Sequence, residues 1–128
     1  MWPFRRAETS LGRRGEKLAA RHLKRRGLKI LARNYRCPAG EVDLIALDPT
    51  NKHLGAETIA FVEVKSRSSD HYTDPESAVR ADKQRRIRKV AGYYLQRRRV
   101  EGYNIRFDIV AVVFDGDRPT VRYTPNAF

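Results

Sequence analysis

The stretch TIAFVEVKSR, residues 58–67, places two charged side chains at the end of an apolar run. The apolar run from Ile59 to Val62 predicts a strand that is covered on both faces. Successive side chains of a strand point to opposite faces, so Glu63 and Lys65 share one face. Burying such charges is costly unless they serve a purpose, which indicates a functional role. The alternative is an ordinary cross-strand ion pair on a solvated face.

A second acid is expected beside Glu63. Residues 41–48 predict the preceding strand, and a short polar connection lets Asp43 stand next to Glu63. Two neighbouring carboxylates repel each other unless a proton or a cation lies between them. Mg²⁺, or Mn²⁺ in its place, suits this pair because it takes hard oxygen ligands, and the carbonyl of Val64 offers another oxygen. Lys65 would then be placed to orient an attacking water or to help deprotonate it.

The rest of the chain predicts an α/β (α+β) fold around one mixed sheet of four to five strands. A helix begins after Thr9 or Ser10 and ends at Gly27, and an Asp-Pro-Glu helix start lies at residues 74–76. A helix between the third and fourth strands implies a parallel crossover in an otherwise antiparallel sheet. We expect one domain over residues 10–128 after a flexible arm, residues 1–9. The other expected elements are strands at 28–36, 41–48, 58–67 and 105–114, a helix at 82–98, and a short edge strand at 120–123.

Charge is unevenly distributed along the 128 residues, whose net charge is +12. Residues 1–36 hold 12 basic and 2 acidic side chains, and residues 80–106 hold 10 and 2, whereas residues 37–79 hold 3 and 8. Such a surplus indicates a polyanionic partner, and the acidic middle segment is what a divalent metal beside a phosphate backbone would require. An anionic membrane is the weaker alternative, because the Arg-rich helices lack a broad apolar face.

Several function classes are excluded by simple counts. The longest apolar run, residues 109–114, has six residues, far short of the ~20 that a membrane span needs. A single cysteine, Cys37, excludes an internal disulfide and a cysteine-based zinc cluster. We therefore expect a cytoplasmic protein.

The combined pattern of acid, spacer and acid-x-lysine after a glutamate-bearing helix resembles the PD-(D/E)XK nuclease superfamily. Within it, the chain resembles the bacterial YraN-type (UPF0102) family of endonuclease-like proteins, and its layout is similar to that of archaeal Holliday junction resolvases. The resemblance covers roughly residues 11–113. The segments that carry it are Gly15-Glu16, Asn34-Tyr35-Arg36, Gly40-Glu41-Val42-Asp43-Leu44-Ile45-Ala46, Phe61-Val62-Glu63-Val64-Lys65-Ser66-Arg67 and Arg106-Phe107-Asp108-Ile109-Val110-Ala111-Val112.

The resemblance implies a restriction-endonuclease-like core and a residue-by-residue assignment of the site. Asp43 and Glu63 would be the metal-binding acids, Lys65 the lysine of the motif, and Glu16 the helix glutamate that reaches the site directly or through water. Val42 stands where the superfamily motif often has proline. A resolvase cuts two strands symmetrically, so the resemblance also favours a two-fold homodimer.

Further residues around this site have two interpretations each. Glu41 is either an edge member of the metal site or a solvated charge. Arg67 and Lys83 are either phosphate contacts or solvated side chains, and Asp108 is expected to pair with a nearby arginine. The remaining candidate nucleic-acid contacts are basic residues of the two helices: Arg13, Arg14, Lys17, Arg85, Arg86 and Lys89.

Two functions are compatible with these features. The first is a Mg²⁺-dependent endonuclease that hydrolyses phosphodiester bonds in DNA, including branched or junction DNA. The second is a nucleic-acid-binding module without catalysis, acting as a scaffold in DNA repair or RNA handling. Base-specific readout is not expected, because the chain carries no recognition-helix, zinc-finger or RNA-binding-sheet pattern.

Overall fold

The structure is a computed structural model that describes residues 10–68, 80–99, 101–116 and 118–128. The expected arm (1–9) and the helix start at 74–76 lie outside the described residues. No described helix is long and apolar enough to cross a membrane. The elements are α1 (Ser10–Arg25), β1 (Lys29–Cys37), β2 (Gly40–Asp48), the 3₁₀ helix η1 (Lys52–Leu54), β3 (Thr58–Ser68), α2 (Ala81–Arg98), β4 (Asn104–Asp115) and β5 (Arg118–Thr124).

The five strands form one mixed sheet in the order β1-β2-β3-β4-β5. Neighbouring strands are antiparallel except β3 and β4, which are parallel and are connected through α2. The predicted mixed sheet with a single parallel crossover is therefore confirmed. β3 is the middle strand of the sheet, and β5 extends beyond the expected 120–123 because it pairs with β4 along its whole length.

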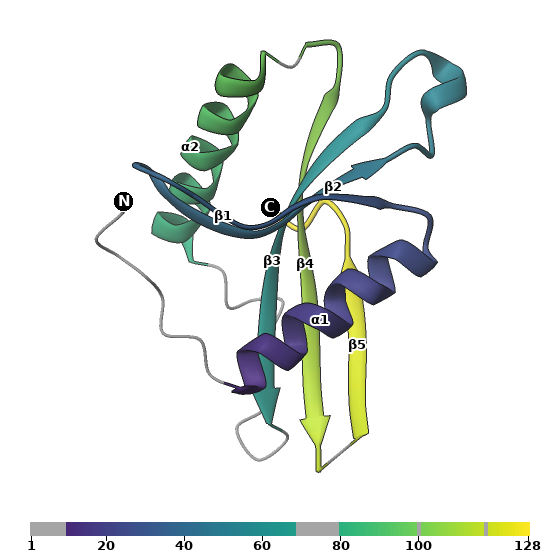
Figure 1. The fold of residues 1–128 in the computed structure, drawn as a ribbon, viewed down its shortest axis with the longest axis vertical. Helices are drawn as coiled ribbons and strands as arrows, with labels where there is room; N and C mark the ends of the chain where they lie inside the picture. The colour runs from purple at the N-terminus through teal and green to yellow at the C-terminus, as the bar shows by residue number, and fades with distance from the viewer. Residues whose placement is uncertain (1–9, 69–79, 100, 117) are drawn as a thin grey trace.

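One helix covers each face of the sheet, which gives three layers. In Figure 1, α1 crosses in front of β3, β4 and β5, and α2 lies beyond β1 and β2. The even-numbered residues Ala60, Val62 and Val64 of β3 pack with α1, whereas Ile59 and Phe61 pack with α2. This alternation explains why residues 59–62 form a continuous apolar run: both faces of β3 are buried.

The end of α1 is fixed by Gly27, as the sequence predicts. Gly27 has φ +92°, its N–H donates to the carbonyl of Lys24, and the N–H of Leu28 donates to the carbonyl of Leu23. These two bonds form a Schellman motif, in which a left-handed glycine satisfies the last helical carbonyls. The chain can therefore turn from α1 directly into β1.

Gly15 sets how closely α1 approaches β3. A Cβ added at Gly15 would lie 1.8 Å from Oγ of Ser66, which no side chain could tolerate without a shift. Gly15 thus permits close packing of the helix on the sheet. Because Ser66 follows Lys65 directly, this contact fixes α1 against the end of β3.

Candidate functional site

Asp43 and Glu63 lie side by side where β2 and β3 separate. The antiparallel pairing of these strands ends at Leu44 and Val62. One residue further, Oδ2 of Asp43 accepts a hydrogen bond of 2.8 Å from the backbone N–H of Val64. The Asp43 side chain thus takes the place of the missing strand partner, and both carboxyls are almost fully buried, with 2% and 3% exposed.

Two lysines neutralise Glu63. Nζ of Lys83, in the first turn of α2, forms an ion pair with Oε2 of Glu63, and Nζ of Lys65 lies 3.8 Å from the same oxygen. Residues 63 and 65 share the face of β3 toward α2, as the sequence predicted. The solvated-face interpretation of Lys83 is not supported, because its side chain reaches back to a buried acid.

The pKa values of these groups are shifted by their surroundings. Burial alone would raise the pKa of Glu63, but its hydrogen bond with the Asp43 carboxyl and the cations of Lys83 and Lys65 hold it below its ordinary value. Burial lowers the pKa of Lys65, and the cations of Lys83 and Arg67 lower it further, against the attraction of Glu63. A lysine with a lowered pKa loses its proton at a lower pH than a solvated one, so more of it is in the neutral form that can act as a base.

Glu63, Lys65 and Lys83 line a cleft of about 580 Å³ between the starts of the two helices. Glu16 of α1 lines the same cleft as Glu63 and Lys65, so the helix glutamate lies at the site, in agreement with the prediction. Glu41 also lines the cleft, where its Oε2 pairs with Nε of Arg36 at 3.1 Å. The full lining comes from α1 (Leu11, Gly12, Glu16), β2 (Gly40, Glu41), β3 (Glu63, Val64, Lys65, Ser66, Arg67) and α2 (Lys83, Arg86, Ile87).

The donor set fits a hard divalent cation that keeps part of its water shell. Asp43 and Glu63 are close enough for a hydrogen bond between their carboxyls, which needs a shared proton or, in its place, a cation. Across the described ranges, no three His, Cys, Asp or Glu side chains are grouped to hold a metal ion together. An ion held here would therefore depend on two carboxylates, the Val64 carbonyl and water, which is how proteins usually bind Mg²⁺.

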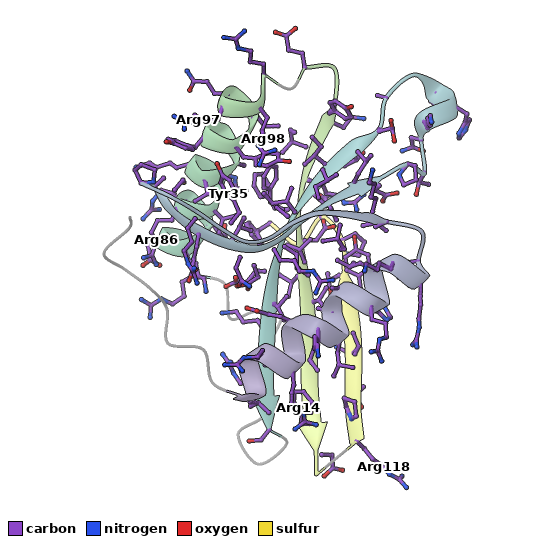
Figure 2. All side chains as sticks on the ribbon, in the orientation of Figure 1. Arg14, Tyr35, Arg86, Arg97, Arg98 and Arg118 are labelled. Carbon is purple, nitrogen blue, oxygen red and sulfur yellow. The ribbon has the colours of Figure 1, made fainter. Side chains whose placement is uncertain are left out.

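The basic residues predicted to contact nucleic acid fall into two groups. Arg67 and Arg86 line the cleft, and Arg13 and Lys17 line a second, smaller hollow beside it. Arg14, Arg85 and Lys89 are exposed on the helices outside both linings, and the guanidinium of Arg14 stands 4.7 Å from the ring centre of Phe114. Figure 2 shows Arg14 beside α1 and Arg86 at the start of α2.

Sequence reasoning missed two residues that the fold brings to this region, Arg33 and Asn34 of β1. Both line the second hollow. Asn34 belongs to a segment that carries the family resemblance, but its left-handed backbone, φ 50°, has no signal in the residue pattern of a strand. The only sequence hint was the irregular alternation of residues 28–36.

A five-stranded mixed sheet with a helix on each face, an acid on β2 and acid-x-lysine on β3 defines a restriction-endonuclease-like α/β fold. Comparison with protein families matches residues 15–112 to "Uncharacterised protein family UPF0102". The chain belongs to this family, which confirms the membership inferred from the sequence motifs.

Relatives from bacteria extend the match over nearly the whole chain. A UPF0102 protein of Geobacter metallireducens is 44% identical over 119 residues, which is 93% of this chain and 92% of the relative. One from Syntrophus aciditrophicus is 46% identical over 91% of this chain and 87% of the relative, and one from Clostridium perfringens is 39% identical over 93% of each. These names state no activity, so the activity of this chain is inferred from its site.

Proposed function

We propose that this protein is a Mg²⁺-dependent endonuclease that hydrolyses phosphodiester bonds in DNA. The observation that carries the proposal is the buried Asp43–Glu63 pair, of which Glu63 lines a cleft between two basic helices together with Lys65. Burying two adjacent acids is unfavourable for folding, because like charges repel and both lose their hydration. An arrangement of this kind is expected where the acids serve a ligand.

Each residue has a part in the proposed reaction. Asp43, Glu63 and the Val64 carbonyl would hold Mg²⁺ or Mn²⁺, which when bound supplies Lewis-acid polarisation of the phosphate and of water. Lys65 would orient the attacking water and accept its proton or balance charge on the phosphate. Arg67 and Arg86 would hold flanking phosphates, and Glu16 would fix the arrangement of water at the cleft. Lys83 would release Glu63 when the cation binds.

The substrate is expected to be selected by shape rather than sequence. The basic helices offer phosphate contacts, which give affinity without base readout. Branched or junction DNA, and a homodimer that cuts two strands, follow only from the resemblance to archaeal resolvases. Both belong to the proposal and are tested together with it.

The test is cleavage of labelled four-way junction, flap, duplex and single-stranded DNA with Mg²⁺ or Mn²⁺. Asp43→Asn keeps the size of the side chain and an oxygen acceptor for the Val64 N–H, but it removes a charge that the cation requires. We expect cleavage to fall at least ~100-fold in this variant, as for loss of a key electrostatic contact, and to stop in EDTA. Asp115→Asn, an exposed aspartate at the end of β4, is the matched control and should cut normally.

A second candidate is the binding module without catalysis, and one observation favours it. Lys83 and Lys65 already neutralise Glu63, as they would in a site that no longer recruits a metal. Salt-sensitive DNA binding without metal-dependent cutting, by a protein confirmed as folded, would support this candidate against the nuclease. Cutting that survives Asp43→Asn would contradict the assigned site.

A further inference from the structure

A second hollow lies next to the cleft, between α1 and β1. It has a volume of about 120 Å³ and room for a phosphate group with water. Arg13, Glu16 and Lys17 line it from α1, Arg33 and Asn34 line it from β1, and Leu44 of β2 completes the lining. The two hollows share Glu16, so they adjoin each other at the first turns of α1.

The two hollows differ in charge. The cleft lining combines three acids, Glu16, Glu41 and Glu63, with four cationic side chains, Lys65, Arg67, Lys83 and Arg86. The second hollow carries three cationic side chains and only the carboxylate of Glu16, which it shares with the cleft. An anion is therefore favoured in the second hollow.

The backbone of β1 is distorted where it forms the hollow. The register of β1 against β2 shifts between Ile30 and Ala32, and Asn34 adopts φ 50°. A left-handed asparagine inside a strand is uncommon and costs energy, and such residues gather at ligand sites. Bulges in edge strands re-aim the side chains that follow them. The distortion and the charged hollow are separate observations, and both place Arg33 and Asn34 at one point.

The hollow is also in register with the acid pair. Arg33 pairs with Leu44 and Tyr35 pairs with Val42, so Asn34 lies opposite Asp43 across the β1–β2 ladder. A nucleic-acid strand whose phosphate lies at the acid pair would therefore pass close to the second hollow. Phosphates are bound by arginine forks and by side-chain amides, both of which the hollow offers.

We propose that Arg33, Asn34, Lys17 and Arg13 form a subsite for a backbone phosphate that neighbours the phosphate at the acid pair. The inference rests on the nucleic-acid substrate of the proposed function, but it does not require that the protein cuts. The subsite binds the phosphodiester charge, so it fixes the position of the strand and reads no base.

The experiment measures binding of a labelled DNA oligonucleotide in EDTA, where no metal-dependent cutting occurs, over a series of salt concentrations. Arg33→Gln should weaken binding several-fold and reduce the slope of log affinity against log salt by about 0.7 on single strands or about 0.9 on duplex. Arg33→Lys, which keeps the charge, should retain most of the slope. The matched control is Arg118→Gln on β5, an exposed arginine at the far end of the molecule in Figure 2.

Asn34→Gly provides a second variant that keeps the fold. Glycine adopts positive φ without strain, so the backbone of β1 is preserved while the amide is lost. We expect weaker binding with an unchanged melting temperature. If Arg33→Gln and Arg118→Gln lower the slope equally, or if neither changes it, the subsite is wrong while the acid-pair proposal stands. If the parent protein binds neither DNA nor RNA, both proposals are overturned.

Discussion

Two groups of buried acids lie in the same sheet, and they differ in how their charges are neutralised. On the α1 face, Asp108 is fully buried and accepts hydrogen bonds from Nε and Nη2 of Arg106, at 2.9 and 3.0 Å, from the Tyr123 hydroxyl and from the N–H of Asn126. Nη1 of Arg106 also lies 3.0 Å from Asp48. This group connects β2, β4, β5 and the C-terminal segment, and both of its carboxylates contact one guanidinium.

The Asp43–Glu63 group has the opposite character. Its acids lie next to each other rather than around a guanidinium, and their neutralising partners are two lysines at a cleft. The arginine group uses planar forks that fit carboxylates and remain charged, which suits a permanent structural contact. In the proposed reaction, a metal cation would take the place of the lysines at Glu63. The comparison separates buried acids held by a guanidinium from the proposed site, where an acid pair is neutralised by two lysines at a cleft.

The pKa shifts reflect the same contrast. Burial and the hydrogen bond to Asp108 raise the pKa of Tyr123 above its ordinary range. Burial by itself would lower the pKa of Arg106, but Asp108, Tyr123 and Asp48 raise it. Tyr123 and Arg106 therefore keep their protons at neutral pH, as a structural contact requires. At the cleft, by contrast, the lowered pKa of Lys65 means that this ammonium loses its proton at a lower pH than a solvated lysine.

The largest effect is expected from breaking the arginine group. Arg106→Ala leaves Asp108 buried without its guanidinium, and removing one partner of a buried pair costs roughly 3–5 kcal/mol. Chemical denaturation followed by circular dichroism measures this loss. Arg118→Ala, an exposed arginine of the adjacent strand, should change the free energy of unfolding by less than about 0.5 kcal/mol. Equal, small losses in both variants would contradict the structural role assigned to Arg106.

An intermediate effect is expected at Gly15, where packing holds α1 against the site. Gly15→Ala forces its Cβ onto Ser66, and overpacking of this kind costs about 1–3 kcal/mol. Gly92→Ala in α2 is the matched control, because nothing lies within 4 Å of the added Cβ. That change should leave stability unchanged or raise it by up to about 1 kcal/mol, since alanine favours the helix.

A double variant separates packing from other causes at Gly15. Ser66→Gly removes the Oγ and Cβ that the new methyl group would meet, so Gly15→Ala should cost much less in that background. The coupling is measured by a double-mutant cycle on the free energy of unfolding. Additive losses would mean that Gly15 is required for a reason other than the approach of α1 to β3.

Much of this arrangement is accessible from the sequence, and the rest is not, for physical reasons. Strand alternation placed Glu63 and Lys65 on one face, which follows from the two-residue period of a strand and is local. The expected arginine partner of Asp108 is Arg106 on the same strand. The reach of Lys83 to Glu63 depends on how α2 is rotated on the sheet, which tertiary packing decides. The conformation of Asn34 depends on the register of β1 against β2, so the second hollow had no counterpart in the pattern.

The smallest effect on stability, and the sharpest comparison, is expected from one isosteric change made in both groups. Asp43→Asn retains an oxygen acceptor for the Val64 N–H and relieves the repulsion between two buried carboxyls. We expect the free energy of unfolding to stay within about 1 kcal/mol of the parent or to rise, because binding sites are often not optimised for stability. Asp108→Asn removes the charge opposite Arg106 and should lower stability by several kcal/mol.

Thermal and denaturant unfolding of the two asparagine variants, measured side by side, decides between the assignments. An unchanged or higher free energy of unfolding for Asp43→Asn, together with a clear decrease for Asp108→Asn, would show that Asp43 destabilises the fold and that Asp108 stabilises it. A loss as large in Asp43→Asn as in Asp108→Asn would make Asp43 a structural residue. In that case, lost cleavage in the same variant would reflect a damaged fold, and the assignment of the acid pair to a metal would have to rest on Glu63 alone.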